Sequence, residues 1–292
     1  MPRAQANGIE IEYETFGSSD DPTLLLVMGL GAQLIAWPDA FCQQLADRGF
    51  FVIRYDNRDV GLSTKFDDAP VKSAAETFGG NVPAAYVLDD MADDAAGLLE
   101  ALGRDKAHVV GASMGGMIAQ LVALRHTDRV LSLTSIMSHA GGDDAVPPDA
   151  EALAVLLAPR PSNRDEVLDM AVKARQVIGG KGWPMDEAKV RADAGRAFDR
   201  CYHPAGFLRQ MAAIMASPSR VERLGSLKMP VLVLHGLDDT LVPPENGRRT
   251  AAAIPGSTLV EVEGMGHDVP EGAWPQIVDA IVANTEKAAA HA

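Results

Sequence analysis

Short and nearly continuous apolar runs alternate with segments of helical periodicity along most of this chain. Residues 23–28 and 50–55 form two such runs, and the segment between them, residues 37–48, has apolar side chains at helical spacing. Strands that are apolar on both faces are typical of a parallel sheet that helices cover on both sides. Further runs of this kind occupy residues 108–110, 130–136, 230–235 and 258–262. This order predicts an α/β fold with a doubly wound, mostly parallel sheet.

Segments outside this alternation have other patterns. Residues 9–14 alternate apolar side chains with glutamates, which predicts a half-exposed hairpin or edge strand. Helical spacing predicts helices over residues 87–102 and 271–284. Residues 65–83 have no clear period and are expected to be irregular, and we expect residues 286–292 to fray.

The strand pattern is interrupted between the run at 130–136 and the run at 230–235, where helical segments are separated by prolines. We therefore expect a core of residues 1–137 and 224–292, with an inserted helical cap at residues 138–223. An insertion after this strand would overhang the carboxyl ends of the parallel strands, where sites of such sheets lie. Large apolar side chains of the cap, such as Trp183 and Met215, are expected to influence substrate choice.

Composition limits the classes of function. A chain of 292 residues that is 47% hydrophobic can bury a large core, and its net charge of −14 argues against a nucleic-acid partner. Cys42 and Cys201 are too few for a disulfide framework and have no metal-ligand spacing. We find no leader, no segment long enough for a membrane span and no cofactor motif, so we expect a cytoplasmic protein without metal or cofactor. The oligomeric state is not indicated.

One short motif indicates a nucleophile. Gly111, Ser113 and Gly115 form G-x-S-x-G between an apolar run and a helix-like segment, residues 117–124. A serine in such a strand, turn and helix has a strained backbone and an exposed hydroxyl, and the glycines avoid collisions with the neighbouring elements. The alternative is a glycine-rich turn with an ordinary serine.

Two later loops supply candidates for the acid and the base. A serine hydroxyl becomes a good nucleophile when a histidine accepts its proton and a carboxylate orients that histidine. Asp238 and Asp239 follow the run at 230–235, and His267 lies in a glycine-lined loop after the run at 258–262. Hydrolases of the strand, turn and helix type have the same chain order of serine, acid and histidine.

With these three loops in order, the chain resembles the α/β-hydrolase superfamily. The acid loop of that family reads G-x-x-D-x-x-x-P, which Gly236, Asp239 and Pro243 match, so the resemblance favours Asp239 over Asp238. His267 follows a glycine, as the histidine of the family does. The resemblance thus implies Ser113, Asp239 and His267 as catalytic residues.

The resemblance extends over residues 9–281. Within the superfamily, it is strongest to certain bacterial esterases. Residues 26–29 and 54–63 look most like bacterial esterases of the aclacinomycin methylesterase type and mycobacterial LipG-like esterases. By the geometry of the family, the oxyanion hole would consist of the backbone N–H groups of Leu30 and Met114.

Other titratable residues are given structural roles. Asp56 and Arg58 are expected to brace the loop beside the oxyanion hole. Asp143 and Asp144 follow the sixth strand, where some relatives keep their acid, and are a less favoured alternative to Asp239. The remaining histidines are expected to be structural or exposed: His108, His126, His139, His203, His235 and His291.

The resulting hypothesis is a serine hydrolase that cleaves small to medium apolar carboxylic esters through an acyl-enzyme. A carbon-carbon hydrolase or perhydrolase with the same triad is one alternative, because the fold does not select the bond. A non-catalytic protein that binds a ligand in the same pocket is another. Dehalogenases and epoxide hydrolases of the family are disfavoured, because they carry aspartate at the position of Ser113.

Overall fold

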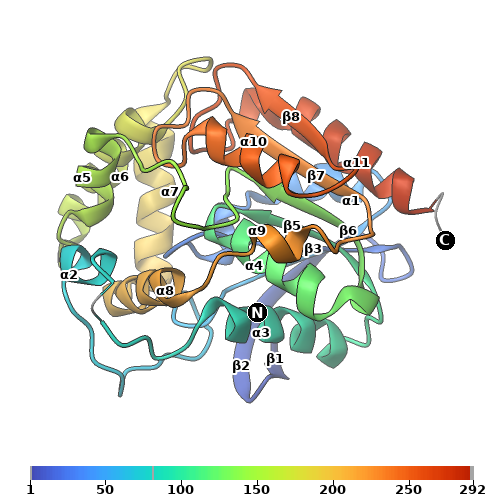
Figure 1. Ribbon diagram of the computed structural model, residues 1–292. Helices are drawn as coiled ribbons and strands as arrows, with labels where there is room; N and C mark the ends of the chain where they lie inside the picture. The colour runs from blue at the N-terminus through green and yellow to red at the C-terminus, as the bar shows by residue number, and fades with distance from the viewer. Residues whose placement is uncertain (1, 81, 290–292) are drawn as a thin grey trace.

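The computed structural model describes residues 2–80 and 82–289 and contains an eight-stranded sheet (Figure 1). The strand order is β1-β2-β4-β3-β5-β6-β7-β8, in which β1 and β2 pair antiparallel and all pairs from β4 to β8 are parallel. The strands are β1 Arg3–Ala6, β2 Ile9–Phe16, β3 Thr23–Val27, β4 Phe51–Tyr55, β5 Ala107–Ala112, β6 Val130–Ile136, β7 Val231–Gly236 and β8 Thr258–Val262. The predicted α/β fold with a doubly wound, mostly parallel sheet is confirmed.

Eleven α-helices accompany these strands in the described ranges. They are α1 Asp39–Ala46, α2 Ala74–Phe78, α3 Leu88–Ala101, α4 Met114–Arg125, α5 Ala150–Leu157, α6 Arg164–Ile178, α7 Glu187–Arg200, α8 Pro204–Ala216, α9 Val221–Leu224, α10 Pro244–Ala252 and α11 Trp274–Ala289.

The alternation of side chains along β3 explains why the core has two layers. Leu25 and Val27 point to one face of the sheet and pack with the buried residues of α3 and α4. Leu24 and Leu26 point to the other face and pack with α1 and α11. Since successive side chains of a strand face opposite sides, a strand between two helical layers is apolar at every position.

The alternating segment at residues 9–14 belongs to the hairpin of β1 and β2 at one edge of the sheet. Asn7 and Gly8 join the two strands with positive φ angles of 47° and 77°. Asn-Gly at a two-residue connection is a strong hairpin signal, because asparagine and glycine tolerate such angles best.

Two local expectations were wrong. Residues 65–83 are not wholly irregular, because α2 lies within them and Ser73 and Glu76 form a capping box at its start. The pair S-x-x-E was the sequence signal for this helix. The chain does not fray at Glu286 either, because α11 continues to Ala289 and the adjacent Ala288 is buried. Residues 290–292 lie outside the described residues.

Residues 138–223, which we call the helical segment, contain α5 to α8 and the start of α9 and, among the residues described, no strand. Figure 1 shows α5 to α8 on one side of the sheet, with α2 beside them, and α2 contacts both α5 and α8. The division into a core and a cap at residues 137 and 224 stays a prediction.

Among the helices in the described part of the chain, none combines the length and the apolar character that crossing a membrane requires.

Candidate active site

Ser113 lies in the turn between β5 and α4 with φ 56° and ψ −122°, a conformation that residues other than glycine rarely adopt. The neighbouring glycines leave room for this turn. A Cβ added at Gly111 would lie 2.0 Å from the carbonyl oxygen of Gly115, and one added at Gly115 would lie 2.1 Å from that of Val27. The strand, sharp turn and helix expected around the serine are therefore present.

Three side chains from separate loops form one hydrogen-bonded row at the end of the sheet. His267 Nε2 lies 2.9 Å from Ser113 Oγ, and His267 Nδ1 lies 2.8 Å from Asp239 Oδ2. Because Nδ1 faces a carboxylate, it carries the imidazole proton, and Nε2 is free to accept the proton of the serine hydroxyl. The arrangement can therefore activate the serine for attack on an electrophilic carbon.

The environment of Asp239 keeps its side chain ionised. Burial raises the pKa of this carboxyl, but the attraction of His267 and hydrogen bonds from His235, His267 and the N–H of Val242 outweigh burial and lower the pKa to about 2. Asp239 Oδ1 accepts the backbone N–H groups of Leu241 and Val242, at 2.9 Å and 2.8 Å. These bonds leave Oδ2 directed at the imidazole of His267.

His235 was expected to be merely structural, but it contacts the acid. Its Nε2 lies 2.7 Å from the carbonyl oxygen of Val242 and 3.4 Å from Asp239 Oδ2. Because Nε2 faces two oxygen acceptors, it donates its proton to them and helps to hold the acid loop. Its position four residues before Asp239, at the end of β7, was the only sequence signal for this role.

The other candidate acids point elsewhere. Asp238 accepts the backbone N–H of Lys181 at 3.0 Å. Asp143 is exposed at the rim of the cavity beside the serine, and Asp144 forms an ion pair with Arg249. Within the described chain, none of these three carboxylates has a hydrogen bond to the imidazole that contacts the serine.

The two expected oxyanion donors lie beside the serine. Met114 is the first residue of α4, and the first N–H groups of a helix have no acceptor within it. Leu30 follows Gly29, where an added Cβ would lie only 3.1 Å from Ser113 Cβ. Both backbone segments therefore lie close to the serine.

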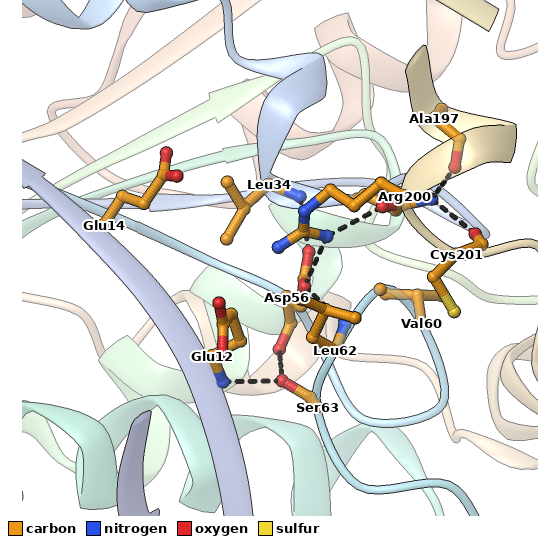
Figure 2. A network of polar contacts seen from close by, with 12 residues as sticks. Glu12, Glu14, Leu34, Asp56, Val60, Leu62, Ser63, Ala197, Arg200 and Cys201 are labelled. Atoms are coloured by element: carbon orange, nitrogen blue, oxygen red, sulfur yellow. Dashed lines mark hydrogen bonds and ion pairs between the residues drawn. The ribbon is translucent and has the colours of Figure 1, made fainter. Parts of the chain in front are cut away.

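Asp56 braces the loop that carries Leu30. It is completely buried, and its Oδ1 accepts the N–H of Leu34 at 2.7 Å. Its Oδ2 accepts the N–H of Leu62 at 2.8 Å and pairs with Arg200 of α7 at 2.7 Å (Figure 2). Burial raises the pKa of Asp56, although Arg200 and the backbone N–H groups oppose the rise. The expected bracing role of Asp56 is present, and its cationic partner comes from the helical segment.

Arg58 was expected to brace the same loop, but its side chain points away from it. Its guanidinium pairs with Asp94 of α3 at 2.6 Å and 2.7 Å. Only the backbone of Arg58 serves the oxyanion loop: its carbonyl oxygen accepts a hydrogen bond from Gln210, whose Oε1 accepts the N–H of Gly31 at 2.8 Å. Asn57 adds a bond from its Nδ2 to the carbonyl oxygen of Met28.

The loop of His267 is held by the last residue of α6 and by the stretch that follows this helix. The N–H of His267 donates to the carbonyl oxygen of Ile178 at 2.7 Å. Asp268 Oδ1 accepts the N–H groups of Gly180 and Gly266, and a Cβ at Gly180 would lie 2.0 Å from the carbonyl oxygen of Gly264. Sequence reasoning missed this contact, although three glycines in residues 179–182 signalled a close approach of two backbones.

A cavity of about 840 Å³ opens above the serine. Most of its wall is apolar and comes from both the sheet end and the helical segment. The large apolar side chains that line it include Met28, Leu30, Met114, Met117, Met137, Phe207, Ile214 and Met215. Trp183 is not among the described lining residues; it packs on the core face of α1 and α11, and its ring approaches Gly272. Of the two cap side chains singled out in the sequence, Met215 therefore lines the cavity and Trp183 does not.

Among the described residues there is no group of three or more histidine, cysteine or carboxylate side chains that could hold a metal ion.

Comparisons with known proteins identify the family of this chain. A family model described as alpha/beta hydrolase fold matches residues 22–164, and one described as TAP-like protein matches residues 210–285. The chain is 33% identical to a rhodomycin D methylesterase of Streptomyces sp. strain C5, over 94% of each chain. It is 28% identical to a 2-hydroxy-6-oxononadienedioate/2-hydroxy-6-oxononatrienedioate hydrolase of Burkholderia vietnamiensis strain G4, over 89% of this chain and 85% of that one.

A solved structure shares the fold. The enol-lactonase from Burkholderia xenovorans LB400 superposes with a TM-score of 0.76 at 24% sequence identity, covering 98% of this chain and 100% of that one. The resemblance indicated by the sequence motifs is confirmed by the family model and by the identity to the methylesterase. This chain belongs to the α/β-hydrolase superfamily and is a hydrolase.

Proposed function

We propose that this hydrolase cleaves carboxylic esters, with Ser113 as nucleophile, His267 as general base and Asp239 as the acid that orients the base. The observation that carries the proposal is the continuous row from Ser113 Oγ to His267 at 2.9 Å and on to Asp239 at 2.8 Å. This spacing lets the serine proton move to Nε2 as the oxygen attacks an ester carbonyl carbon.

In the first half of the reaction, the attack converts the ester carbonyl into a tetrahedral centre with a negatively charged oxygen. The N–H groups of Leu30 and Met114 stabilise that oxygen, because they are fixed dipoles beside a mainly apolar cavity wall. The protonated His267 then gives its proton to the departing alcohol, and an acyl group remains on Ser113. Water activated by His267 releases the acid in the second half.

Two observations support esters of small alcohols on an apolar acyl part. The cavity wall beside Ser113 is mainly apolar. The relative from Streptomyces is a methylesterase and is similar over nearly its whole length. The helical segment supplies much of the wall, so we propose that it selects the substrate while the sheet end performs the chemistry.

The same three residues also suit a carbon-carbon hydrolase or perhydrolase. A related oxononadienedioate hydrolase in the comparisons supports the first of these. The hydrolase relatives argue against the remaining alternative, a protein that only binds a ligand in this cavity.

An activity-based experiment separates these functions. Purified protein is treated with a fluorophosphonate and then assayed with p-nitrophenyl and methyl esters of increasing acyl length, beside a ring-opened dienoate as the carbon-carbon substrate. Labelling that is lost in Ser113→Ala, together with ester turnover, is the expected result. Labelling with turnover of the dienoate alone would favour the carbon-carbon hydrolase, and absence of labelling would contradict an activated serine.

A further inference from the structure

Arg160, which lies just after α5, lines the same cavity as Ser113 and His267. Among the described lining residues it is the only arginine or lysine. The only carboxylate that lines the cavity is Asp143, which is exposed and, within the described structure, forms no ion pair with Arg160. The cavity wall thus carries one fixed cation without a protein anion opposite it.

The hydrogen-bond donors of Arg160 are only partly used. A guanidinium has five N–H groups. One on Nη2 donates to the carbonyl oxygen of Leu156 at 2.8 Å, and one on Nη1 approaches the sulfur of Met170, a weak acceptor, at 3.2 Å. The Nε–H is enclosed and has no acceptor in the described structure. One N–H on each terminal nitrogen therefore remains for a further partner.

The ring of Phe207 supports the cation without satisfying these donors. The guanidinium carbon of Arg160 lies 3.9 Å from the ring centroid. This cation–π contact with a residue of α8 favours the charge of the guanidinium, but the face of a ring does not replace an in-plane acceptor.

Arg160 differs from several other arginines of the interior, which pair with carboxylates. Arg58 pairs with Asp94, Arg200 with Asp56 and Arg209 with Asp59, each a carboxylate at hydrogen-bond distance. Burial lowers the pKa of Arg160, and no carboxylate compensates for that burial. Arg104 and Arg220 also form no ion pair in the described structure, but neither belongs to the described cavity wall. Arg104 is bonded to the carbonyl oxygen of Ser19, and Arg220 is bonded to Gln120 and to a backbone carbonyl.

A partly buried charge is costly unless an anion or several acceptors compensate it. In a chain with 40 acidic residues, an unpaired arginine in the substrate cavity is best explained by an anion that arrives with the substrate. We propose that this enzyme acts on esters that carry a separate carboxylate, and that Arg160 binds this carboxylate while Ser113 attacks the ester. This inference rests on the proposed ester hydrolysis and specifies its substrate class.

The test compares monomethyl esters of succinic, adipic, suberic and sebacic acid with the corresponding dimethyl esters. Wild-type protein should prefer the half ester at the chain length that spans the cavity. Arg160→Gln should lower kcat/KM for that half ester by about 10- to 150-fold, mainly through KM, because a hydrogen-bonded contact to a charge is lost. The dimethyl ester should change by no more than about twofold.

Two further variants separate charge from packing. Arg160→Lys keeps the charge but loses the planar fork, so its kcat/KM for the half ester should lie between those of wild type and Arg160→Gln. Arg164→Gln is the matched control, because Arg164 lies on the same helical segment, is exposed and pairs with Asp199 outside the cavity. It should leave the ratio of half ester to dimethyl ester unchanged.

Equal losses on both esters in Arg160→Gln would overturn the proposal, because the guanidinium would then bind a neutral oxygen or only pack on Phe207. If the variant is misfolded by circular dichroism, wild-type protein still decides the question. Dicarboxylates should inhibit p-nitrophenyl acetate hydrolysis more strongly than the matching diamides, and less so at high salt. Equal inhibition would overturn the proposal.

Fluorophosphonate labelling of the same samples tests the proposed function separately. A protein that is not labelled contradicts ester hydrolysis, whatever Arg160 does, and calorimetric titration with the dicarboxylates then tests the anion site by itself. A labelled protein that prefers dimethyl esters contradicts only the role of Arg160.

Discussion

The oxyanion side and the base side of Ser113 are both attached to the helical segment, but by different interactions. On the oxyanion side, Asp56 joins the N–H of Leu34 to the guanidinium of Arg200, a contact between charged side chains. On the base side, the N–H of His267 bonds to the carbonyl oxygen of Ile178, a contact between backbones.

The two attachments differ in what they tolerate. A buried ion pair depends on charge, so removal of either charged side chain breaks the pair in the interior and is costly. A glycine-lined contact depends on space, so any added side-chain atom forces two backbones apart. The comparison predicts that the oxyanion side fails by loss of charge and the base side by gain of volume.

The largest expected effect is on the acid. Asp239→Asn should lower kcat by about 10,000-fold, because the amide no longer fixes the productive tautomer of His267. Asp238→Asn is the matched control and should be mild, since Asp238 contacts only the backbone of Lys181. Steady-state kinetics on a p-nitrophenyl ester measure both. A larger loss of kcat in Asp238→Asn than in Asp239→Asn would show that the acid is misassigned.

On the oxyanion side, Asp56→Ala should reduce the free energy of unfolding by about 3–5 kcal/mol, because the N–H groups of Leu34 and Leu62 lose their buried acceptor and the ion pair with Arg200 is broken. Urea denaturation measures this loss. Asp199→Ala removes the exposed pair with Arg164 and should cost less than about 1 kcal/mol. Similar losses in both variants would show that the buried pair contributes no more to the free energy of unfolding than the exposed pair does.

On the base side, Gly180→Ala should lower kcat with little change in KM, because the new Cβ would displace the loop that holds His267. Overpacking of this kind costs about 1–3 kcal/mol of stability. Gly225→Ala is the control, since a Cβ there would have its nearest neighbour at 3.4 Å. Wild-type kinetics in Gly180→Ala would contradict the close approach.

The pH dependence of stability should also depend on the acid. The folded pKa of Asp239, about 2, lies below its usual value of 3.8, so the ionised carboxylate stabilises the folded state above about pH 4. That stabilisation, about 2 kcal/mol, should be lost as the pH falls from about 4 towards 2. Urea titrations of wild type and Asp239→Asn measure it, and parallel curves for the two proteins would refute it.

The smallest effect concerns the cavity wall rather than either attachment. Met215→Ala should change the ratio of kcat/KM between short and long acyl esters by about tenfold, because Met215 lines the cavity. The rate of fluorophosphonate labelling should stay close to that of wild type. Trp183→Ala, outside the described wall, should leave the ester ratio unchanged, and a shift as large as that of Met215→Ala would contradict this assignment.

Much of the fold was predictable because its signals are local. Continuous apolar runs indicated buried parallel strands. The strands β3, β4, β6, β7 and β8 begin and end within one residue of those runs. The short helix α2 was missed although its capping box was present in the sequence. A helix of this length has too few apolar positions for a period to be seen, so only its cap identified it.

The main residues of the candidate site were predictable from the sequence, but not all of their contacts were. Ser113 was expected from a turn that needs glycine on both sides, and the structure places His267 and Asp239 beside it, as the order of the loops suggested. The contact of His235 with the acid was not expected. Nothing in a single sequence distinguishes a buried histidine that touches an acid from one that fills the core.

By itself, the sequence determined the doubly wound sheet, the strained serine turn and the loops that carry Asp239 and His267. These features depend on periodicity and turn chemistry within a few consecutive residues. Only the tertiary structure decided that Arg200 reaches Asp56, 144 residues away, that Ile178 holds the base loop, and that Arg160 faces the cavity without a carboxylate partner. Such contacts depend on how whole helices pack against the sheet, and that packing is a property of the assembled chain.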